Sequence, residues 1–260
     1  MPKLISALHS NPHPAWNDFL TKEIITEIDL IEKEISPSDY TPPIERVLHF
    51  LTLDISKIKV LILGQDPYPQ AGAATGKAFE VGTLKNWNQP FRNVSLKNIV
   101  RLIHATYEGE YLSYKSIIAL NNENPMILPP NKLFQDWEEQ GVLLLNTAFT
   151  CETSKSASHS KLWKPFSLKL HQFIATNYPD IYWILWGNHA QQITSDLPLK
   201  NVAQSNHPMM CSKKSEKDFL FGKVNTFEAT KHLVDWRGAS LCNQTSEKDE
   251  INYRQTRLNL

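Results

Sequence analysis

The chain has 260 residues, enough for one large domain or two small ones whose hydrophobic core needs no disulfide or metal. Hydrophobic residues make up 41% of the sequence and charged residues 21%, which is typical of a folded globular protein and excludes a disordered chain. Lysine and arginine together number 27, as do aspartate and glutamate, so the formal net charge is zero. No global charge attracts a polyanion such as nucleic acid, and a partner of this kind would have to bind at a local basic patch.

The first predicted element is a helix over residues 17–34, where apolar residues recur at helical spacing among charged ones. Pro37, Pro42 and Pro43 end this pattern. A second, short helix is predicted over residues 44–51, because proline is well tolerated at the start of a helix.

Four short apolar runs follow, and each ends abruptly in polar residues. These runs are residues 59–64, 141–145, 182–187 and 201–205. Their length and their β-branched or aromatic content predict buried parallel strands. Helical stretches are predicted between them, at residues 95–107, 131–140, 165–177 and 190–195. This alternation predicts an α/β fold, a single domain over residues 1–237 with a short central four-stranded parallel sheet flanked by helices in three layers.

Two segments do not fit this alternation. Residues 108–131 are weakly patterned and contain three prolines near their end, so we expect an exposed excursion between two elements. Residues 238–260 are polar and aperiodic, which predicts a mobile C-terminal tail.

The three cysteines favour a reducing compartment. Cys151, Cys211 and Cys242 lie far apart, which suits neither a disulfide framework nor the paired spacing of a zinc site. The first 16 residues lack the apolar core of a signal peptide, and no apolar run reaches membrane-spanning length. We therefore expect a soluble protein with no bound metal and no membrane partner, in the cytoplasm or, for a eukaryotic or viral source, in the nucleus.

Polar residues stand at or just beyond the end of each predicted strand. They are Asp66, Asn146, Asn188 and His207. Open parallel sheets bind ligands beyond the carboxyl ends of their strands. We therefore expect these four residues to converge on one crevice.

The turn GQDPYP, residues 64–69, is rigid because each of its two prolines restricts the residue before it to an extended backbone. Such a turn would hold the Asp66 and Tyr68 side chains in place for a function. An ordinary surface β-turn fits the same local pattern equally well.

Three further residues each have an ordinary structural explanation when taken alone. His207 fits a hydrogen-bonded histidine, and Phe79 fits a core residue. Asn146 ends a very apolar strand, where its amide either caps a turn or binds the edge of a heterocycle through a paired donor and acceptor.

Taken together, the motifs resemble one family. GQDPYP, GKAF, GVLLLNTAFT, WILWGNHAQ and SNHP occur in this order and resemble family-1 uracil-DNA glycosylases over roughly residues 15–237. The resemblance implies a hydrolase of base excision repair that removes uracil from single- or double-stranded DNA and leaves an abasic site. It implies no metal and no cofactor, a monomer as the acting form, and a proteinaceous inhibitor as a candidate partner.

The resemblance also implies a catalytic pair. Asp66 matches the carboxylate that positions the attacking water and stabilises the positive charge that develops on the deoxyribose. His207 matches the histidine that donates a hydrogen bond to the uracil 2-oxygen, a task that a neutral imidazole can perform.

Four other matches concern the flipped-out base. Asn146 corresponds to the amide that bonds the Watson–Crick edge, and Phe79 to the ring on which uracil stacks. Gln65 corresponds to the residue whose backbone lies against the base, and Tyr68 to the aromatic wall beside carbon 5.

The DNA backbone would be held by small polar residues and a basic cluster. The family binds DNA phosphates at positions that correspond to Ser95, Asn188 and Ser212. A serine is common in the family at the position of Asn188. Lys213, Lys214 and Lys217 form the best candidate for a local phosphate patch, although such a cluster is more often a solvated surface.

Two further departures from the family pattern stand close to the catalytic pair. Pro69 occupies the place of the usual histidine. Met209, Met210 and Cys211 replace a loop whose leucine enters the emptied base stack, and we expect them to supply that wedge.

Two alternative functions remain at this stage. One is a DNA-binding or processivity module that kept the fold and lost turnover, which the presence of both Asp66 and His207 disfavours. The other is a related glycosylase with a wider base specificity, which Tyr68 disfavours.

Overall fold

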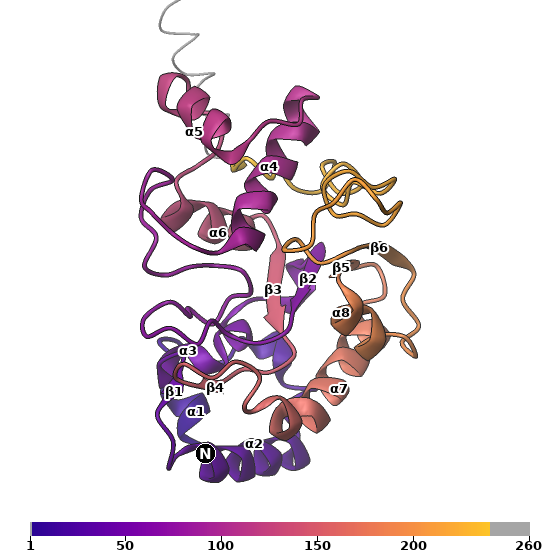
Figure 1. Ribbon diagram of the computed structural model, residues 1–260. Helices are drawn as coiled ribbons and strands as arrows, with labels where there is room; N and C mark the ends of the chain where they lie inside the picture. Colours follow the sequence, from indigo (N-terminus) through magenta and orange to yellow (C-terminus); the bar gives the residue numbers. More distant parts are fainter. Residues whose placement is uncertain (1, 240–260) are drawn as a thin grey trace, which may run out of the picture.

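The computed structural model describes residues 2–239, and Figure 1 shows their arrangement. The helices are α1 (Lys3–Ser6), α2 (Lys22–Ile35), α3 (Ile44–Val47), α4 (Val94–Glu108), α5 (Tyr114–Glu123), α6 (Pro130–Glu139), α7 (Ser160–Asn177) and α8 (Asn188–Ile193). The strands are β1 (Tyr40–Thr41), β2 (Val60–Gly64), β3 (Val142–Asn146), β4 (Cys151–Glu152), β5 (Tyr182–Trp186) and β6 (Asn201–Ser205). Short 3-10 turns are η1 (Pro14–Trp16), η2 (His49–Thr52) and η3 (Ile55–Lys57).

The central sheet has the strand order β3-β2-β5-β6, and every neighbouring pair is parallel. Each of its strands lies within one of the four predicted apolar runs or extends it by a single residue, which confirms the predicted α/β class. Val60 at the start of β2 pairs with Val142 on one side and Tyr182 on the other, so the strands begin at the same level. Their carboxyl ends therefore lie along one edge of the sheet.

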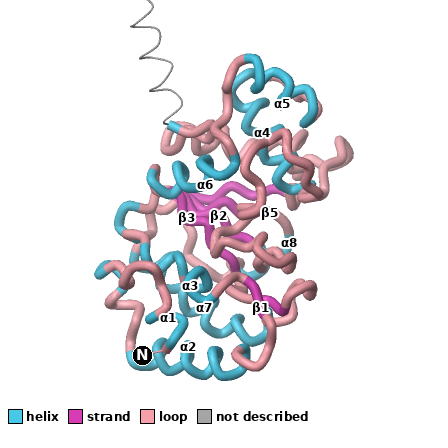
Figure 2. The backbone as a smooth tube through the Cα atoms, turned by 90° about the vertical axis from the view of Figure 1, so that its left-hand side faces the viewer, coloured by secondary structure: helices cyan, strands magenta, loops and turns pink. Residues whose placement is uncertain are grey.

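Helices cover both faces of this sheet, as Figure 2 shows. Successive side chains of a strand point to opposite faces, so Leu61 and Leu63 enter the core beneath α2 and α7, and Val60 and Ile62 enter the core beneath α4 and α6. All five residues of β2 and of β3 are buried. This burial on both faces explains why the strands are continuous apolar runs without a polar alternation.

Several helix boundaries differ from the expectation, including that of α7, which begins at Ser160 instead of residue 165 and contains Pro165. The helix expected over residues 17–34 begins only at Lys22, because Thr21 caps it and its Oγ1 accepts a hydrogen bond from the Ile24 amide at 3.3 Å. The helix expected over residues 44–51 is split into α3 and η2, because Leu48 has a non-helical backbone between them.

The connection over residues 108–131 is more ordered than an exposed excursion. It contains α5, whose Ile117 and Ile118 are buried in the core that also holds α4. The hydroxyl of Tyr114 donates a hydrogen bond to the Trp87 carbonyl at 2.8 Å. Two adjacent isoleucines among polar residues give a weak helical pattern, which is why the sequence did not indicate this helix. The predicted tail lies outside the described residues except for 238 and 239.

A buried ionic network joins α6 to two distant segments. The Glu138 carboxylate lies 2.8 Å from the Lys77 ammonium and 3.0 Å from Nε2 of His49. The side chains of Lys77 and Glu138 are only 8% and 10% exposed. Burial alone would raise the pKa of Glu138, but the hydrogen bond to His49 and the charge of Lys77 outweigh it and hold that pKa below its ordinary value.

Glu138→Gln is expected to lower the free energy of unfolding by about 3 kcal/mol at pH 7, because it removes the nearer counter-charge of buried Lys77 and leaves it the Glu80 carboxylate at 3.9 Å. Urea denaturation followed by circular dichroism measures this difference. The neighbouring Glu139→Gln is the matched control, because Glu139 is exposed and bonds only Gln135 among the described residues.

The dependence of this difference on pH has a defined sign. Because the folded pKa of Glu138 lies below the ordinary value of 4.5, its contribution is fully present above that pH and is lost as the pH falls through the folded pKa. The stabilities of Glu138→Gln and the parent protein should therefore converge in acid. Equal stabilities at pH 7 would contradict the role assigned to this network.

Candidate active site

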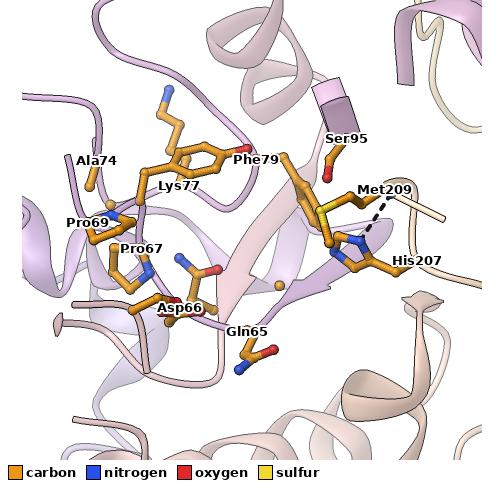
Figure 3. A pocket seen from close by; sticks show the side chains of 15 residues that line it. Gln65, Asp66, Pro67, Pro69, Ala74, Lys77, Phe79, Ser95, His207 and Met209 are labelled. Atoms are coloured by element: carbon orange, nitrogen blue, oxygen red, sulfur yellow. Dashed lines mark hydrogen bonds between the residues drawn. The ribbon is translucent and has the colours of Figure 1, made fainter. Parts of the chain in front are cut away.

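A cavity of about 270 Å³ opens at the carboxyl ends of β2 and β3. Figure 3 shows Asp66 and His207 on different sides of it. Eight residues predicted from the sequence line this cavity: Gln65, Asp66, Tyr68, Phe79, Ser95, Asn146, His207 and Met209. An adjoining cavity of about 290 Å³ shares Gln65, Phe79 and His207 and adds Asn188 and Met210. The four predicted strand-end residues therefore do surround one region.

The alignment of β2 with β3 places Asn146 directly opposite Gly64. A side chain at position 64 would overlap the Asn146 amide oxygen and come within 2.9 Å of Ala78. Glycine is therefore required here so that the Asn146 side chain can occupy the space above the strand end. Asn146 is only 5% exposed, and no described residue hydrogen-bonds its amide. A buried amide without a partner is suited to bind a polar ligand.

The Asp66 carboxylate is oriented by a loop about ninety residues later in the chain. Its Oδ2 accepts hydrogen bonds from the Ser156 hydroxyl at 2.6 Å and from the Ala157 amide at 2.7 Å. No residue in the described part of the chain hydrogen-bonds Oδ1, which leaves this oxygen for a ligand or water. Neither donor could be predicted from the sequence, because nothing in the local pattern links position 66 to position 156.

Phe79 is held in an uncommon conformation. Its φ is +66°, which is unfavourable for a residue with a side chain and is often found at functional positions. Its ring packs edge-on against Trp186 with centroids 5.1 Å apart, and it lies 6.1 Å from the His207 ring. Phe79 is half-buried and lines both cavities. Its ring is therefore available to a ligand, which a side chain enclosed in the core would not be.

Tyr68 packs against the hydrophobic core that lies between the sheet and helices α4 and α6, and it also lines the cavity. Burial raises the pKa of its hydroxyl to about 12, an effect that a hydrogen bond with Asn93 opposes. An ordinary turn residue would place this hydroxyl in water. The packing therefore favours the interpretation in which the ring is a fixed wall of the site.

The His207 ring has a defined tautomer. Nδ1 accepts a hydrogen bond from the Met209 amide at 3.2 Å, drawn as a dashed line in Figure 3, so Nε2 carries the proton of the neutral ring. Burial holds the pKa of His207 below its ordinary value. Gly187 allows this placement of the ring, because a Cβ atom at position 187 would lie 2.9 Å from the His207 Cβ. The φ of Gly187 is +87°, which residues with a side chain rarely adopt. The ring is therefore a neutral hydrogen-bond donor.

A second histidine acts on the backbone of the site. The Thr147 hydroxyl donates to the Gln65 carbonyl at 2.8 Å and lies 2.8 Å from Nε2 of His189, which must then donate. Burial lowers the pKa of His189, although the Asp66 charge opposes this effect. Neither Thr147 nor His189 was among the predicted site residues, although both belong to the matched motifs.

The loop after His207 projects into solvent. Met209 and Met210 are 60% and 66% exposed, which is unusual for large apolar side chains. Cys211 is instead half-buried, and its Sγ lies 3.3 Å from the Pro208 carbonyl oxygen. The two methionines thus form the projecting tip, and the cysteine lies at its base.

Internal hydrogen bonds anchor this loop. The buried Asp218 carboxylate accepts the Ser212 amide at 2.6 Å, and the Asn98 side chain of α4 donates to the Pro208 carbonyl at 2.7 Å. Ser212 and Lys213 lie outside both cavities on the exposed part of the loop, as do Lys214 and Lys217. The ammonium of Lys213 lies 5.0 Å from the ring of Phe221.

The described residues offer neither a candidate metal centre nor a candidate membrane-spanning helix. No cluster of three histidine, cysteine, aspartate or glutamate side chains there could hold a metal ion. Among residues 2–239, no helix is both long and apolar enough to span a membrane.

Comparison with known proteins places these features in a family. A family model described as the uracil DNA glycosylase superfamily matches residues 52–231. A uracil-DNA glycosylase from Pseudoalteromonas translucida is 32% identical over 238 residues, which cover 88% of this chain and 97% of the relative. These matches agree with the family that the sequence motifs resemble.

Solved structures share the fold. Wild-type UNG from Nitratifractor salsuginis aligns with a TM-score of 0.69 at 23% identity, over 91% of this chain and 96% of that one. A mimivirus UNG variant crystallised in complex with UGI aligns with a TM-score of 0.59 at 24% identity, over 88% of this chain and 85% of its own.

The protonation of His207 can be checked directly. At pH 7, long-range ¹H–¹⁵N NMR correlations are expected to show a neutral ring with its proton on Nε2, and a titration midpoint below 6.5. Met209→Pro removes the amide donor and should weaken the preference for this tautomer. A proton on Nδ1, or a charged ring at pH 7, would contradict the assigned geometry.

Proposed function

The chain belongs to the uracil DNA glycosylase superfamily, and we propose that its cavity carries out the hydrolysis by which this enzyme excises uracil from DNA. The observation that carries the proposal is the convergence of Asp66, Asn146 and His207 around one cavity with Phe79 as its wall. The DNA must present a flipped-out nucleotide, because a cavity of about 270 Å³ can admit a base but not a duplex.

The reaction exchanges one bond for another. The bond between deoxyribose C1′ and uracil N1 breaks, and its electron pair leaves with the base. The oxygen of a water molecule bonds to C1′, and a proton from that water is taken up by the departing uracil anion after its release from the sugar. The products are an abasic site and free uracil, and the enzyme is unchanged.

Asp66 acts on the sugar side of this bond. Its carboxylate stabilises the positive charge that develops on the deoxyribose and orients the attacking water. The two donors on Oδ2 leave Oδ1 available for this task. A fixed anion requires little reorganisation during the reaction, which is the reason that preorganised groups are effective catalysts.

His207 and Asn146 act on the base. The neutral ring donates from Nε2 to the uracil 2-oxygen, where negative charge collects as the bond breaks. The unpartnered Asn146 amide offers a donor and an acceptor to the Watson–Crick edge. Phe79 stacks on the base, and the Gln65 backbone lies against it, held by Thr147.

The surface around the cavity supports contact with DNA. Ser95 lines the cavity and Asn188 the adjoining one, so both can reach phosphates beside the flipped nucleotide. Ser212 and Lys213 extend this surface along the loop that carries Met209 and Met210. We propose that these methionines enter the emptied base stack of a duplex.

Two statements about partners complete the proposal. We propose a monomer as the acting form, because Asp66, Asn146 and His207 of one chain suffice for the proposed reaction and no second subunit is required. The mimivirus relative was solved in complex with UGI, an inhibitor protein, which supports a proteinaceous inhibitor as a further partner.

The decisive test is release of free uracil by the purified protein. The substrate is an oligonucleotide with one deoxyuridine, and the control is the same sequence with thymidine. Chromatography measures the free base, and alkaline cleavage measures the abasic site. Binding of the deoxyuridine oligonucleotide without release would favour the alternative, a binding module that lost turnover.

Asp66→Asn is expected to lower the single-turnover excision rate by about a hundredfold or more, while the affinity for uracil-DNA is retained. The amide has the shape of the carboxylate but lacks its charge. Asp180→Asn, at an exposed position, serves as the control. A rate near that of the parent protein would remove Asp66 from the mechanism.

Tyr68→Ala is expected to permit release of thymine and to weaken release of uracil. An apolar pocket with spare room discriminates a methyl group by only about 1–3 kcal/mol, so a rigid wall is the stronger filter. Tyr68→Phe keeps the ring and should remain selective for uracil. If Tyr68→Ala is fully active on uracil and silent on thymine, the ring is not the filter.

Replacing both Met209 and Met210 by alanine should reduce excision from duplex DNA more than from single strands. Only the duplex has a base stack that must be opened and kept open. Val224→Ala is the control, because Val224 is an exposed apolar residue outside both cavities. Equal losses on the two substrates would exclude the wedge.

A further inference from the structure

The loop between β4 and α7 is attached to the turn that carries Asp66. The Ser154 amide donates to the Pro69 carbonyl at 2.7 Å, and the Cys151 thiol to the Pro67 carbonyl at 3.4 Å. Pro67 and Pro69 have no N–H group, in the backbone or in the side chain, that could donate a hydrogen bond to the Asp66 carboxylate. Hydrogen bonds to the carboxylate of this turn therefore come from the loop, not from the turn itself.

The loop adopts its course at a conformational cost. Ser154 and Ala157 have φ values of +66° and +61°, in the left-handed region that residues other than glycine rarely adopt. With this course, the Ser156 hydroxyl and the Ala157 amide converge on the same oxygen of Asp66. Strain of this kind persists where the surrounding contacts demand it.

The two hydrogen bonds to Asp66 are short. At 2.6 and 2.7 Å they have the lengths of charge-assisted bonds, which are stronger than bonds between neutral groups. Two donors on Oδ2 restrict rotation of the carboxyl group. Oδ1 is then kept in one position relative to the cavity.

We propose that Ser156 is a positioning residue of the excision reaction, whose hydroxyl holds the Asp66 carboxylate so that Oδ1 faces the attacking water. This inference rests on the role proposed for Asp66. Ser156 itself lines the cavity, so its hydroxyl lies within the site.

The Ser156 hydroxyl is not needed to form the loop. Other contacts supply the order, including the bond of Ser154 to Pro69 and the bond of the Glu152 amide to the Ser158 hydroxyl at 2.7 Å. Ser156 is exposed, so removing its hydroxyl leaves no buried group unsatisfied. The contact with Asp66 is its one side-chain hydrogen bond to a described residue.

The test compares three variants by steady-state and single-turnover uracil release. Ser156→Ala is expected to lower kcat about tenfold with KM within about twofold, because the Ala157 amide still supports the carboxylate. Ser156→Thr retains a hydroxyl and should recover most of the rate. Ser154→Ala is the matched control on the same loop, because the exposed Ser154 hydroxyl makes no hydrogen bond to a described residue while its amide keeps the bond to Pro69, and this variant should stay within about twofold of the parent protein.

A double variant separates positioning from a general effect on the loop. In the Asp66→Asn background, Ser156→Ala should cause almost no additional loss, because the charge that it orients is already gone. Full additivity would overturn the proposal, as would a Ser156→Ala rate within twofold of the parent or an equal loss in Ser154→Ala. If the parent protein releases no uracil, the proposed function fails; if only Ser156→Ala behaves like the parent, this inference alone fails.

Discussion

The parallel alignment of four strands, with β2 and β3 buried throughout, is the constraint on which the site depends. Because β2 pairs with β3 and β5 from the same level, chemistry-bearing residues from widely separated parts of the chain meet at one edge. A slip of one residue in this register would turn each buried side chain to the opposite face, so the two cores protect the geometry of the site. Gly64 and Gly187 then remove the side chains that would fill the space required by Asn146 and His207.

Much of this arrangement could be predicted from the sequence, because short apolar runs that end in polar residues identify both the strands and the edge at which a ligand binds. The positions of Asp66, Asn146 and His207 followed from that pattern. Contacts between segments without a shared periodicity did not, and Ser156 and the ionic partners of Lys77 are examples. A hydrogen bond across ninety residues leaves no local signal, since many polar loop residues could have made it. The helix α5 was missed for a related reason, because only two of its residues are buried.

The electrostatics of the cavity are arranged without a large net charge. In the proposed mechanism, a carboxylate that accepts two hydrogen bonds acts on the sugar, and a histidine kept neutral by burial acts on the base. The opposite choice, a charged imidazole, would attract Asp66 and compete with the developing cation for its charge. By keeping the His207 ring uncharged, burial leaves the Asp66 charge available for its proposed role. The structure shows no hydrogen bond between these two described side chains.

The dependence of Asp66 on the loop before α7 also bears on how the protein is made. During synthesis, the ribosome releases the turn that carries Asp66 long before residues 156 and 157. A nascent chain that ends after β3 holds the Asp66 carboxylate without its two donors, and it also lacks β5 and β6. The last strand of the sheet, β6, and His207 follow later still, so the proposed site is complete only near the end of synthesis.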